Sequence, residues 1–248
     1  MKHEKAAVKQ AIILCAGYGR RMAPLTDKMP KPLVSVAGRP ILDYILDGLR
    51  KEGIEKIVMN THYHAHQIKD YVSGITDLKA PEIIISHEEN LLNTGGGILK
   101  ALTYLDDDTV FVLSGDSIWH DNYGITLLKK MESVWDPQKM DCLIALQKTD
   151  RVRVGKAAGD YHIDENGKCI RSPDKTGDCM FTGIRILHRR LFAECIPEQP
   201  FSFLDLMDKA EGGGRLHGII NNAGDWYHLS TPGDICTLSN LMLGRVPA

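Results

Sequence analysis

Continuous apolar runs alternate with amphipathic stretches from residue 10 to residue 134. A short continuous apolar run predicts a strand buried on both faces, whereas apolar residues three and four positions apart predict a helix with one buried face. The predicted strands are 10–15, 55–60, 82–86 and 109–113, and the predicted helices are one opened by Pro40 and ended by Gly53, then 66–72, 97–105 and 125–134. This alternation predicts a doubly wound, Rossmann-like α/β fold with a mostly parallel sheet, whose ligands bind beyond the carboxyl ends of the strands.

The pattern changes after a further predicted strand at 140–147. Asn166 and Gly167 are a hairpin signal. The elements predicted after the hairpin are a strand at 180–188, a helix at 203–211, a pair of strands at 216–220 and 226–229 joined through 221–225, and a helix at 232–243. They predict a small antiparallel extension of the sheet. Because no internal repeat or linker separates the halves, we expect a single domain over 1–248, with 1–9 as a flexible leader.

Composition narrows the possible partners and location. Thirty Lys and Arg residues against 32 Asp and Glu residues give a net charge of −2, without a run of like charges, so we expect no nucleic-acid partner. No apolar run is long enough to span a bilayer and no signal peptide is evident, which predicts a cytoplasmic protein without a membrane partner. The six cysteines lack a C-x-x-C pair, which favours reduced core residues over a zinc site or a disulfide framework.

A glycine-rich loop with basic residues follows the first predicted strand. Gly17 and Gly19 let the backbone approach a ligand, and Arg20 and Arg21 are donors for phosphoryl oxygens. The spacing matches neither the dinucleotide motif nor the P-loop, so the glycines alone indicate only a turn. Further along, two prolines hold Lys31 on a stiff loop, which suits an ammonium that neutralises charge during phosphoryl transfer.

Three runs together carry a family resemblance. They are G-x-G-x-R-M-x-P-L-T from Gly17, P-K-P-L-V from Pro30 and G-x-P-I-L from Gly38. In this order they resemble the signature of the sugar-1-phosphate nucleotidyltransferases, and the resemblance extends over residues 10–243. Within the family, the T-G-G-G-I run and the short chain are most similar to the uridylyltransferases that act on N-acetylmuramate 1-phosphate in peptidoglycan recycling. A C-terminal β-helix domain, which several relatives carry, is not expected.

The resemblance implies a nucleotide-sugar synthesis that uses a nucleoside triphosphate, a sugar 1-phosphate and Mg²⁺, with Mn²⁺ as a possible substitute. Its implied catalytic residues are Arg21, Lys31 and Asp116. Its implied nucleotide-binding residues are Ala16, Gly17, Gly19, Arg20, Arg21, Lys31, Asn93, Thr94, Gly95 and Gly96. Its implied sugar-binding residues are Gly159, Asp160, Thr182 and Gly183. Each residue alone also has a structural explanation, such as a cap for Asp116, but their joint occurrence favours the site.

One position departs from the family pattern. The family's second metal ligand is an aspartate in W-x-D-[VI]-G-T, whereas this chain has His228 between Trp226 and Thr231. Asp116 with the substrate phosphates could suffice for Mg²⁺, because this ion is commonly bound through one or two carboxylates. His228 is therefore either a metal ligand that suits Mn²⁺ better or a hydrogen-bond donor to the sugar or a phosphate.

Several alternatives remain open at this stage. Another member of the family, such as a mannose-1-phosphate guanylyltransferase, would share every motif, and a non-catalytic regulator that binds nucleotide or sugar phosphate would keep the fold. The lactyl carboxylate of N-acetylmuramate needs a cation, for which the candidates are Arg153, Lys156, Arg171 and Lys175. His62, His64 and His66 have no nearby carboxylate or cysteine, so solvent-exposed side chains are expected there rather than a metal site. The oligomeric state is not predicted.

Overall fold

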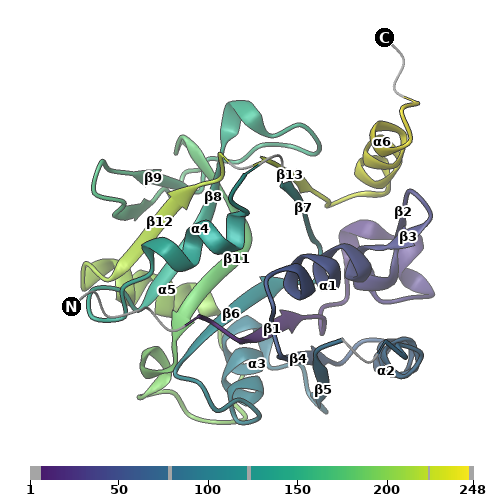
Figure 1. Ribbon diagram of the computed structural model, residues 1–248, viewed down its shortest axis with the longest axis horizontal. Helices are drawn as coiled ribbons and strands as arrows, with labels where there is room; N and C mark the ends of the chain where they lie inside the picture. Colours follow the sequence, from purple (N-terminus) through teal and green to yellow (C-terminus); the bar gives the residue numbers. More distant parts are fainter. Residues whose placement is uncertain (1–6, 78–79, 122–123, 223, 246–248) are drawn as a thin grey trace.

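A mixed sheet forms the centre of the structure (Figure 1). The computed structural model describes residues 7–77, 80–121, 124–222 and 224–245. Four parallel strands make up one half of the sheet, in the order β6, β1, β4 and β5. Their bounds are Thr109–Ser114 for β6, Gln10–Leu14 for β1, Lys56–Thr61 for β4 and Glu82–His87 for β5. Each strand lies within one residue of its predicted bounds, and the parallel pairing confirms the predicted α/β fold.

The other half of the sheet is mainly antiparallel. Strand β11 pairs antiparallel with β6, β8 and β9, while β10 pairs with β9 and β12 runs parallel to β8. These strands are β8 (Cys142–Lys148), β9 (Tyr161–Ile163), β10 (Cys169–Arg171), β11 (Cys179–His188) and β12 (Leu216–Ile220). The register of β11 on β8 shifts between Phe181 and Arg185. Gly183 lies in this bulge with a φ of 80°, a left-handed conformation that favours glycine.

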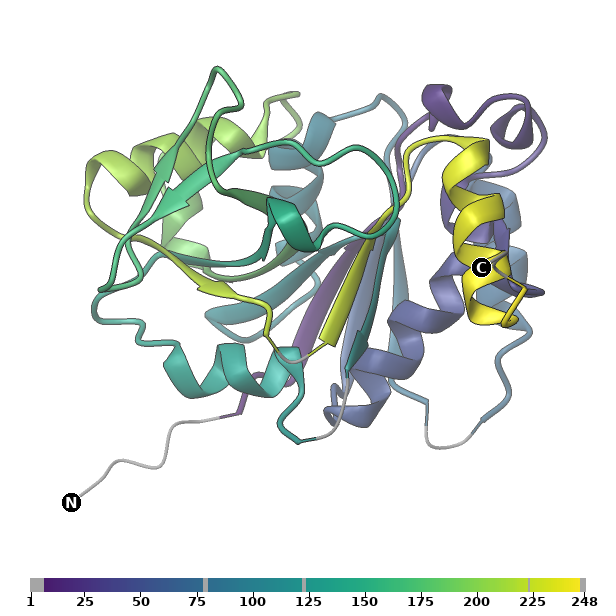
Figure 2. The ribbon, with the colours of Figure 1, turned by 90° about the horizontal axis from the view of Figure 1, so that it is seen from above.

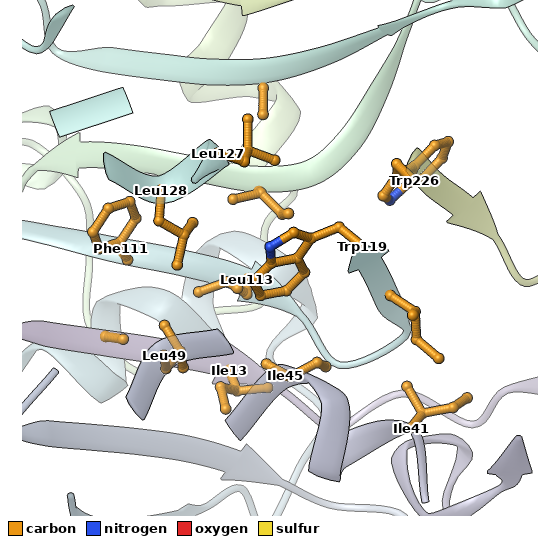
Figure 3. Packing of buried hydrophobic residues seen from close by; sticks show 14 of the residues in the cluster. Ile13, Ile41, Ile45, Leu49, Phe111, Leu113, Trp119, Leu127, Leu128 and Trp226 are labelled. Carbon is orange, nitrogen blue, oxygen red and sulfur yellow. The ribbon is translucent and has the colours of Figure 1, made fainter. Parts of the chain in front are cut away.

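Helices cover both faces of the sheet (Figures 1 and 2). They are α1 (Ile41–Lys51), α2 (Ala65–Ser73), α3 (Asn93–Leu102), α4 (Leu127–Val134), α5 (Phe203–Gly212) and α6 (Pro232–Met242). Helices α1 and α4 pack into one hydrophobic cluster, whereas α3 and α5 pack into a second cluster. Ile45 and Leu49 of α1 lie close to Ile13 of β1 and to Trp119 (Figure 3). The apolar stripe of α1 therefore serves the sheet-facing role that its spacing predicts.

Two strands form a separate small sheet that the sequence patterns did not predict correctly. Strand β13 (Gly224–His228) pairs antiparallel with β7 (Ser117–Asp121), and Trp226 lies opposite Trp119. The sequence patterns predicted no strand at 117–121, and they wrongly paired 216–220 with 226–229. Strand β12 instead pairs parallel with β8 of the main sheet. Because β7 and β13 pair, the residues just after β6 and just after β13 lie at the same edge of the main sheet.

Short elements complete the chain. They are strands β2 (Ser35–Val36) and β3 (Arg39–Pro40) and the 3₁₀ turns Arg20–Met22, Leu25–Asp27, Lys31–Leu33, Thr149–Arg151 and Arg189–Phe192. Helix α6 lies beside β2 although the two are far apart in sequence, and the Ala37 amide donates to Ser239 Oγ at 3.0 Å. The turn at 31–33 holds Lys31 between two prolines, as the sequence predicts.

Burial and helix length bear on three smaller expectations. Residues 1–6 of the predicted leader lie outside the described residues, whereas Val8 is buried and its amide donates to Glu132, so residue 8 packs on the fold. Four of the six cysteines are buried as expected, whereas Cys195 is partly exposed and Cys236 is exposed. Over the described ranges, the helices are too short or too polar to cross a membrane.

Candidate active site

A cavity of about 410 Å³ opens at the carboxyl ends of β1, β4 and β6. This is the edge at which a doubly wound sheet is expected to bind ligands. The side chains and backbone around it come from the loop after β1, from the start of α3 and from the ends of the three strands. The lining residues are Leu14, Cys15, Ala16, Gly17, Gly19, Arg20, Arg21, Lys31, Pro32, Asn60, Leu91, Asn93, Thr94, Ser114, Gly115, Asp116 and Ser230. Most of the residues that were predicted to bind the nucleotide are therefore brought together.

The loop after β1 requires its second glycine. Gly19 has a φ of 64°, and a Cβ there would lie 3.0 Å from Thr26 Cγ2 and 3.3 Å from Lys31 Cβ. Thr26 Oγ1 also donates a hydrogen bond to the Gly19 carbonyl at 3.0 Å. A Cβ at Gly17 would have no atom within 4 Å, so this glycine leaves open space beside the cavity. The glycines thus make the loop tight and leave its backbone accessible.

Two arginines on this loop supply unpaired positive charge. Arg20 and Arg21 both line the cavity, and neither guanidinium group makes an ion pair or a hydrogen bond within the described ranges. The Arg20 guanidinium lies over the Tyr18 ring, 5.1 Å from its centroid. Guanidinium groups are strong bidentate donors to phosphoryl oxygens. An anionic ligand in the cavity would therefore find free cations already in position.

Lys31 and Asp116 form an ion pair at the deep end of the cavity. Lys31 Nζ lies 2.5 Å from Asp116 Oδ2 and donates to the Leu229 carbonyl at 2.6 Å. The Lys31 side chain is only 13% exposed, whereas that of Asp116 is 37% exposed. The pair ties the loop after β1 to the ends of β6 and β13, segments that are far apart in the sequence. Two of the three predicted catalytic groups therefore meet where the strands end.

A second, smaller cavity of about 170 Å³ adjoins the first. Four residues line both cavities: Arg21, Ser114, Asp116 and Ser230. The other lining residues are Ser117, Phe181, Thr182, Gly183, Trp226, His228 and Leu229. A Cβ at Gly183 would lie 2.7 Å from Ser114 Oγ and from Ser117 Oγ, so only glycine fits the wall there. Two ligands bound in these cavities would meet beside Arg21 and Asp116.

His228 faces the smaller cavity, but its ring is already engaged. Its Nε2 atom makes a hydrogen bond with Ser230 Oγ. Burial lowers the pKa of His228; the neighbouring Asp116 carboxylate opposes this shift, while Lys31 and Arg21 reinforce it. The imidazole is therefore stabilised in its neutral form.

A divalent cation would find one carboxylate at this place. Asp116 is the one acidic residue among the lining residues of the two cavities, and its Oδ1 atom has no bond within the described ranges. No group of three His, Cys, Asp or Glu side chains able to hold a metal occurs in the described parts of the chain. Mg²⁺ can be held by a single carboxylate together with ligand phosphates and water, so Asp116 fits that ion, whereas ligation by His228 stays a prediction.

The predicted sugar-binding residues fall into two groups. Thr182 and Gly183 line the smaller cavity, whereas Gly159 and Asp160 line neither cavity. The Asp160 carboxylate accepts from Lys175 Nζ at 2.6 Å and from the Phe181 amide at 2.9 Å. Its contact with the sugar therefore stays a prediction, and the structure gives it a different role: it fixes the backbone of Phe181, which does line the cavity.

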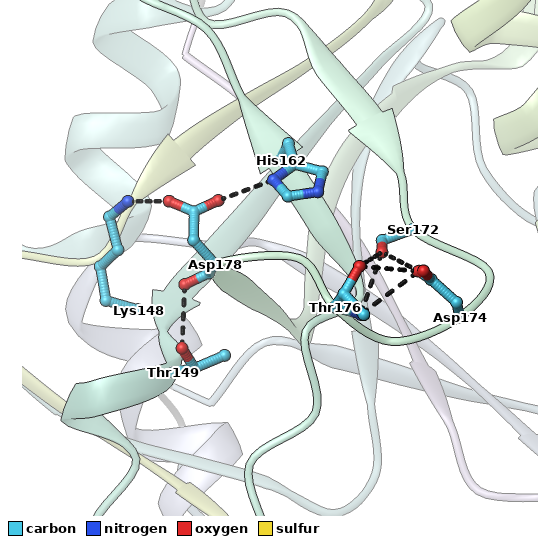
Figure 4. A network of polar contacts seen from close by, with 7 residues as sticks. All are labelled: Lys148, Thr149, His162, Ser172, Asp174, Thr176 and Asp178. Atoms are coloured by element: carbon cyan, nitrogen blue, oxygen red, sulfur yellow. Dashed lines mark hydrogen bonds and ion pairs between the residues drawn. The ribbon is translucent and has the colours of Figure 1, made fainter.

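The insert around these residues is held by its own polar contacts. Ser172, Asp174 and Thr176 bond to one another, and Asp178 accepts from Lys148 and lies 3.5 Å from His162 Nδ1 (Figure 4). Lowered pKa values of Asp174, from its hydroxyl partners, and of Asp178, from Lys148, keep both carboxyls ionised. These contacts hold the insert in a defined conformation.

The contact of Gly95 and Gly96 with the nucleotide stays a prediction, and the structure gives these glycines a packing role. Asn93 and Thr94 line the larger cavity, but Gly95 and Gly96 do not. They lie in the first turn of α3, which begins four residues before the predicted start. A Cβ at Gly95 would lie 2.2 Å from the Phe201 ring, and one at Gly96 would lie 2.5 Å from the Gln199 carbonyl. Their small size is needed where the segment before α5 packs on α3.

Asn60 and Glu88 are site residues that the sequence patterns did not reveal. Asn60 lines the cavity, accepts from the Cys15 amide at 2.8 Å and donates to Glu88 Oε1 at 2.7 Å. Glu88 is fully buried, and its Oε2 accepts from the Leu92 amide at 2.8 Å. This network joins the end of β1, the end of β4 and the segment before α3, which all contribute residues to the cavity lining. A polar residue at the end of an apolar strand is the one signal that points to Asn60.

Two of the three histidines after β4 are not the solvent-exposed side chains that were expected. His62 Nδ1 donates to the Glu88 carbonyl at 2.9 Å, which leaves Nε2 to accept from the Tyr18 hydroxyl at 3.3 Å. His64 Nε2 lies 3.3 Å from the Asp27 carbonyl. Only His66 is exposed. The spacing on the sequence could not show that the loop after β1 folds against this segment.

Comparisons with known proteins agree with this geometry. A sequence profile described as Nucleotidyl transferase matches residues 10–151. N-acetylmuramate alpha-1-phosphate uridylyltransferase from Caulobacter vibrioides is 35% identical, over 91% of this chain and 93% of its own. D-glycero-alpha-D-manno-heptose 1-phosphate guanylyltransferase from Campylobacter jejuni is 28% identical, over 81% and 85%. The solved inositol-1-phosphate CTP transferase from T. maritima shares the fold, with a TM-score of 0.74, 18% identity and coverage of 98% and 100%.

Proposed function

Because this chain belongs to the nucleotidyl transferase family, we propose that it joins a nucleoside monophosphate, taken from a nucleoside triphosphate, to a sugar 1-phosphate. One observation carries this proposal most directly. The larger and the smaller cavity share Arg21 and Asp116, so two phosphorylated substrates can approach each other there. The triphosphate occupies the larger cavity, and the sugar 1-phosphate occupies the smaller one.

The reaction needs alignment and charge stabilisation rather than a general base. An oxygen of the sugar phosphate is already anionic, so it attacks the α-phosphorus directly; the bond from this phosphorus to the bridging oxygen breaks, and pyrophosphate leaves with that oxygen. Arg20 and Arg21 hold phosphoryl oxygens. Lys31 offsets the negative charge that grows on the leaving pyrophosphate. This assignment is supported by the unpaired state of the two arginines in the described chain.

Mg²⁺ is the proposed cofactor, with Asp116 as its protein ligand. When bound, the ion would neutralise charge on the phosphates and polarise the reacting phosphoryl group. The Asp116 Oδ1 atom is free to bind it while Oδ2 keeps its bond to Lys31. In this proposal His228 is a neighbour of the ion rather than a ligand, because Asp116 with the substrate phosphates suffices for Mg²⁺ and His228 Nε2 bonds Ser230.

Metal titrations of three proteins test the place of His228. We expect His228→Ala to keep the wild-type concentrations of Mg²⁺ and of Mn²⁺ at half-maximal activity, because no ligand is lost. We expect His228→Asp to need several-fold less Mg²⁺, because a second carboxylate is added. A selective loss of Mn²⁺ activation in His228→Ala would show that the imidazole does bind the ion.

The finer proposal is that the substrates are UTP and N-acetylmuramate 1-phosphate. It is supported by the relative from Caulobacter vibrioides, whose name specifies a uridylyl group and this sugar. The alternative substrate pair is a guanosine nucleotide with a heptose 1-phosphate, which is supported by the name of the guanylyltransferase from Campylobacter jejuni. A non-catalytic regulator is disfavoured because Lys31, Asp116 and Arg21 all remain at the junction of the cavities.

A sugar that carries a carboxylate needs a free cation beside the smaller cavity. Three of the four cations considered from the sequence are engaged in ion pairs: Arg153 with Asp225, Arg171 with Asp208, and Lys175 with Asp160. Lys156 has no ion pair within the described ranges and is exposed. Its neighbour Gly155 packs on His228, because a Cβ at Gly155 would lie 3.1 Å from His228 Cβ. We therefore assign recognition of the carboxylate to Lys156.

This assignment predicts a change in specificity. Lys156→Met should lower kcat/KM for N-acetylmuramate 1-phosphate by about tenfold, because a charge-assisted contact is worth roughly 1.5 kcal/mol. Activity with N-acetylglucosamine 1-phosphate, which lacks the carboxylate, should stay within twofold. Lys51→Met, which removes an exposed lysine at the end of α1, is the matched control. Equal losses on both sugars would argue against Lys156.

A further inference from the structure

Three side chains at the start of α2 hold the loop that carries Arg20, Arg21 and Lys31. They bind three consecutive backbone carbonyls, those of residues 26–28. The contacts are Tyr63 Oη to the Thr26 carbonyl at 2.9 Å, Gln67 Nε2 to the Lys28 carbonyl at 2.8 Å, and His64 Nε2 to the Asp27 carbonyl at 3.3 Å. We call Tyr63, His64 and Gln67 the clasp.

The clasp acts on the part of the loop that sets the positions of its cations. Residues 26–28 lie between the turn that carries Arg21 and the turn that carries Lys31. Thr26 packs on Gly19, where a Cβ would lie 3.0 Å from Thr26 Cγ2. The Thr26 hydroxyl also donates to the Gly19 carbonyl. A displacement of residues 26–28 would therefore move the glycine turn and the lysine turn together.

Backbone strain indicates that these contacts are strongly favoured. His64 has a φ of 50° and a ψ of 36°, the left-handed conformation that is unfavourable for a residue with a Cβ. It is the residue that precedes α2, so this conformation turns the chain from β4 into the helix. Such strain persists only where the surrounding contacts determine the conformation, and it is concentrated at functional sites.

We infer that Tyr63 and Gln67 are positioning residues for the triphosphate. They line neither cavity, and they act by fixing the loop so that its arginines are preorganised. Without the two side-chain donors, the loop would have to be ordered when the nucleotide binds, and this ordering would weaken binding. The inference rests on the proposed function, because it assumes that the larger cavity binds a triphosphate.

The test compares a double variant with a control on the same helix. Tyr63→Phe combined with Gln67→Met removes both donors while it keeps the side-chain volumes. Tyr71→Phe also removes a hydroxyl of α2, but this hydroxyl donates to Asp43 rather than to the loop. Binding of inorganic tripolyphosphate, KM for the nucleotide, KM for the sugar 1-phosphate and the melting temperature are measured for wild type and both variants.

We expect the double variant to bind tripolyphosphate about tenfold more weakly and to raise KM for the nucleotide to a similar extent, with KM for the sugar 1-phosphate within twofold of wild type. Tyr71→Phe should keep wild-type values for both ligands. Equal tripolyphosphate binding by all three proteins would overturn the inference, as would equal losses in both variants. If the double variant does not fold, Tyr63→Phe alone decides by the same comparison. A wild-type protein that neither binds tripolyphosphate nor releases pyrophosphate would instead overturn the proposed function.

Discussion

Replacing Asp116 with asparagine is expected to lower kcat by roughly 10²–10³-fold while the fold stays intact. Asp116 is the one carboxylate that lines the two cavities, and it stands where the two proposed substrates meet. Asparagine keeps the volume but removes the negative charge that would hold Mg²⁺ and pair with Lys31. Because Asp116 is 37% exposed and the asparagine side-chain oxygen can still accept from Lys31 Nζ, the substitution should leave the protein folded.

The measurement is the rate of pyrophosphate release beside the melting temperature. Asp47→Asn, which removes an exposed carboxylate of α1 that pairs with Arg39, controls for a general loss of charge. An Asp116→Asn rate within about tenfold of wild type would correspond to less than roughly 1.4 kcal/mol of transition-state stabilisation. Asp116 would then not be the ligand of the metal.

For Lys31→Met we expect a loss of about 100-fold in kcat with less than about fivefold change in KM for the nucleotide. The ammonium is held by Asp116 and by the Leu229 carbonyl, so its position is set before the nucleotide binds. Its charge should matter most when negative charge moves onto the leaving pyrophosphate. Methionine preserves the packing of the aliphatic stem in this stiff turn.

Steady-state kinetics with varied nucleotide separates kcat from KM. Lys31→Arg retains the charge on a longer side chain and should keep more activity than Lys31→Met. An unchanged kcat with a raised KM in Lys31→Met would mean that the lysine only helps to dock the nucleotide.

The central fold could be predicted because its signals are local. The four parallel strands are continuous apolar runs, and α1 shows a regular stripe from Ile41 to Leu49. Strand β7 was missed because Ser117–Asp121 is short and half polar, and it becomes a strand through its pairing with β13, more than 100 residues away. The start of α3 was missed because its glycines are poor helix formers, and contacts with Gln199 and Phe201 override this preference.

The part of the site that could be predicted lies in local sequence motifs. Gly19, Arg21 and Lys31 lie within one short stretch of sequence, and Asp116 ends a recognisable strand. The network of Asn60 and Glu88 joins segments that become neighbours only after folding, so no local pattern could reveal it. Gly95 and Gly96 line neither cavity, so their contact with the nucleotide stays a prediction, because a sequence does not tell which side of a glycine must stay open.

The most direct test of the proposed reaction is a pyrophosphate-release assay with Mg²⁺ that crosses four nucleoside triphosphates with a panel of sugar 1-phosphates, including N-acetylmuramate 1-phosphate. We predict the highest kcat/KM with UTP and N-acetylmuramate 1-phosphate, with one nucleotide sugar formed for each pyrophosphate released. Absence of pyrophosphate release with every pair, from a folded protein that still binds nucleotide, would contradict the proposed transferase activity.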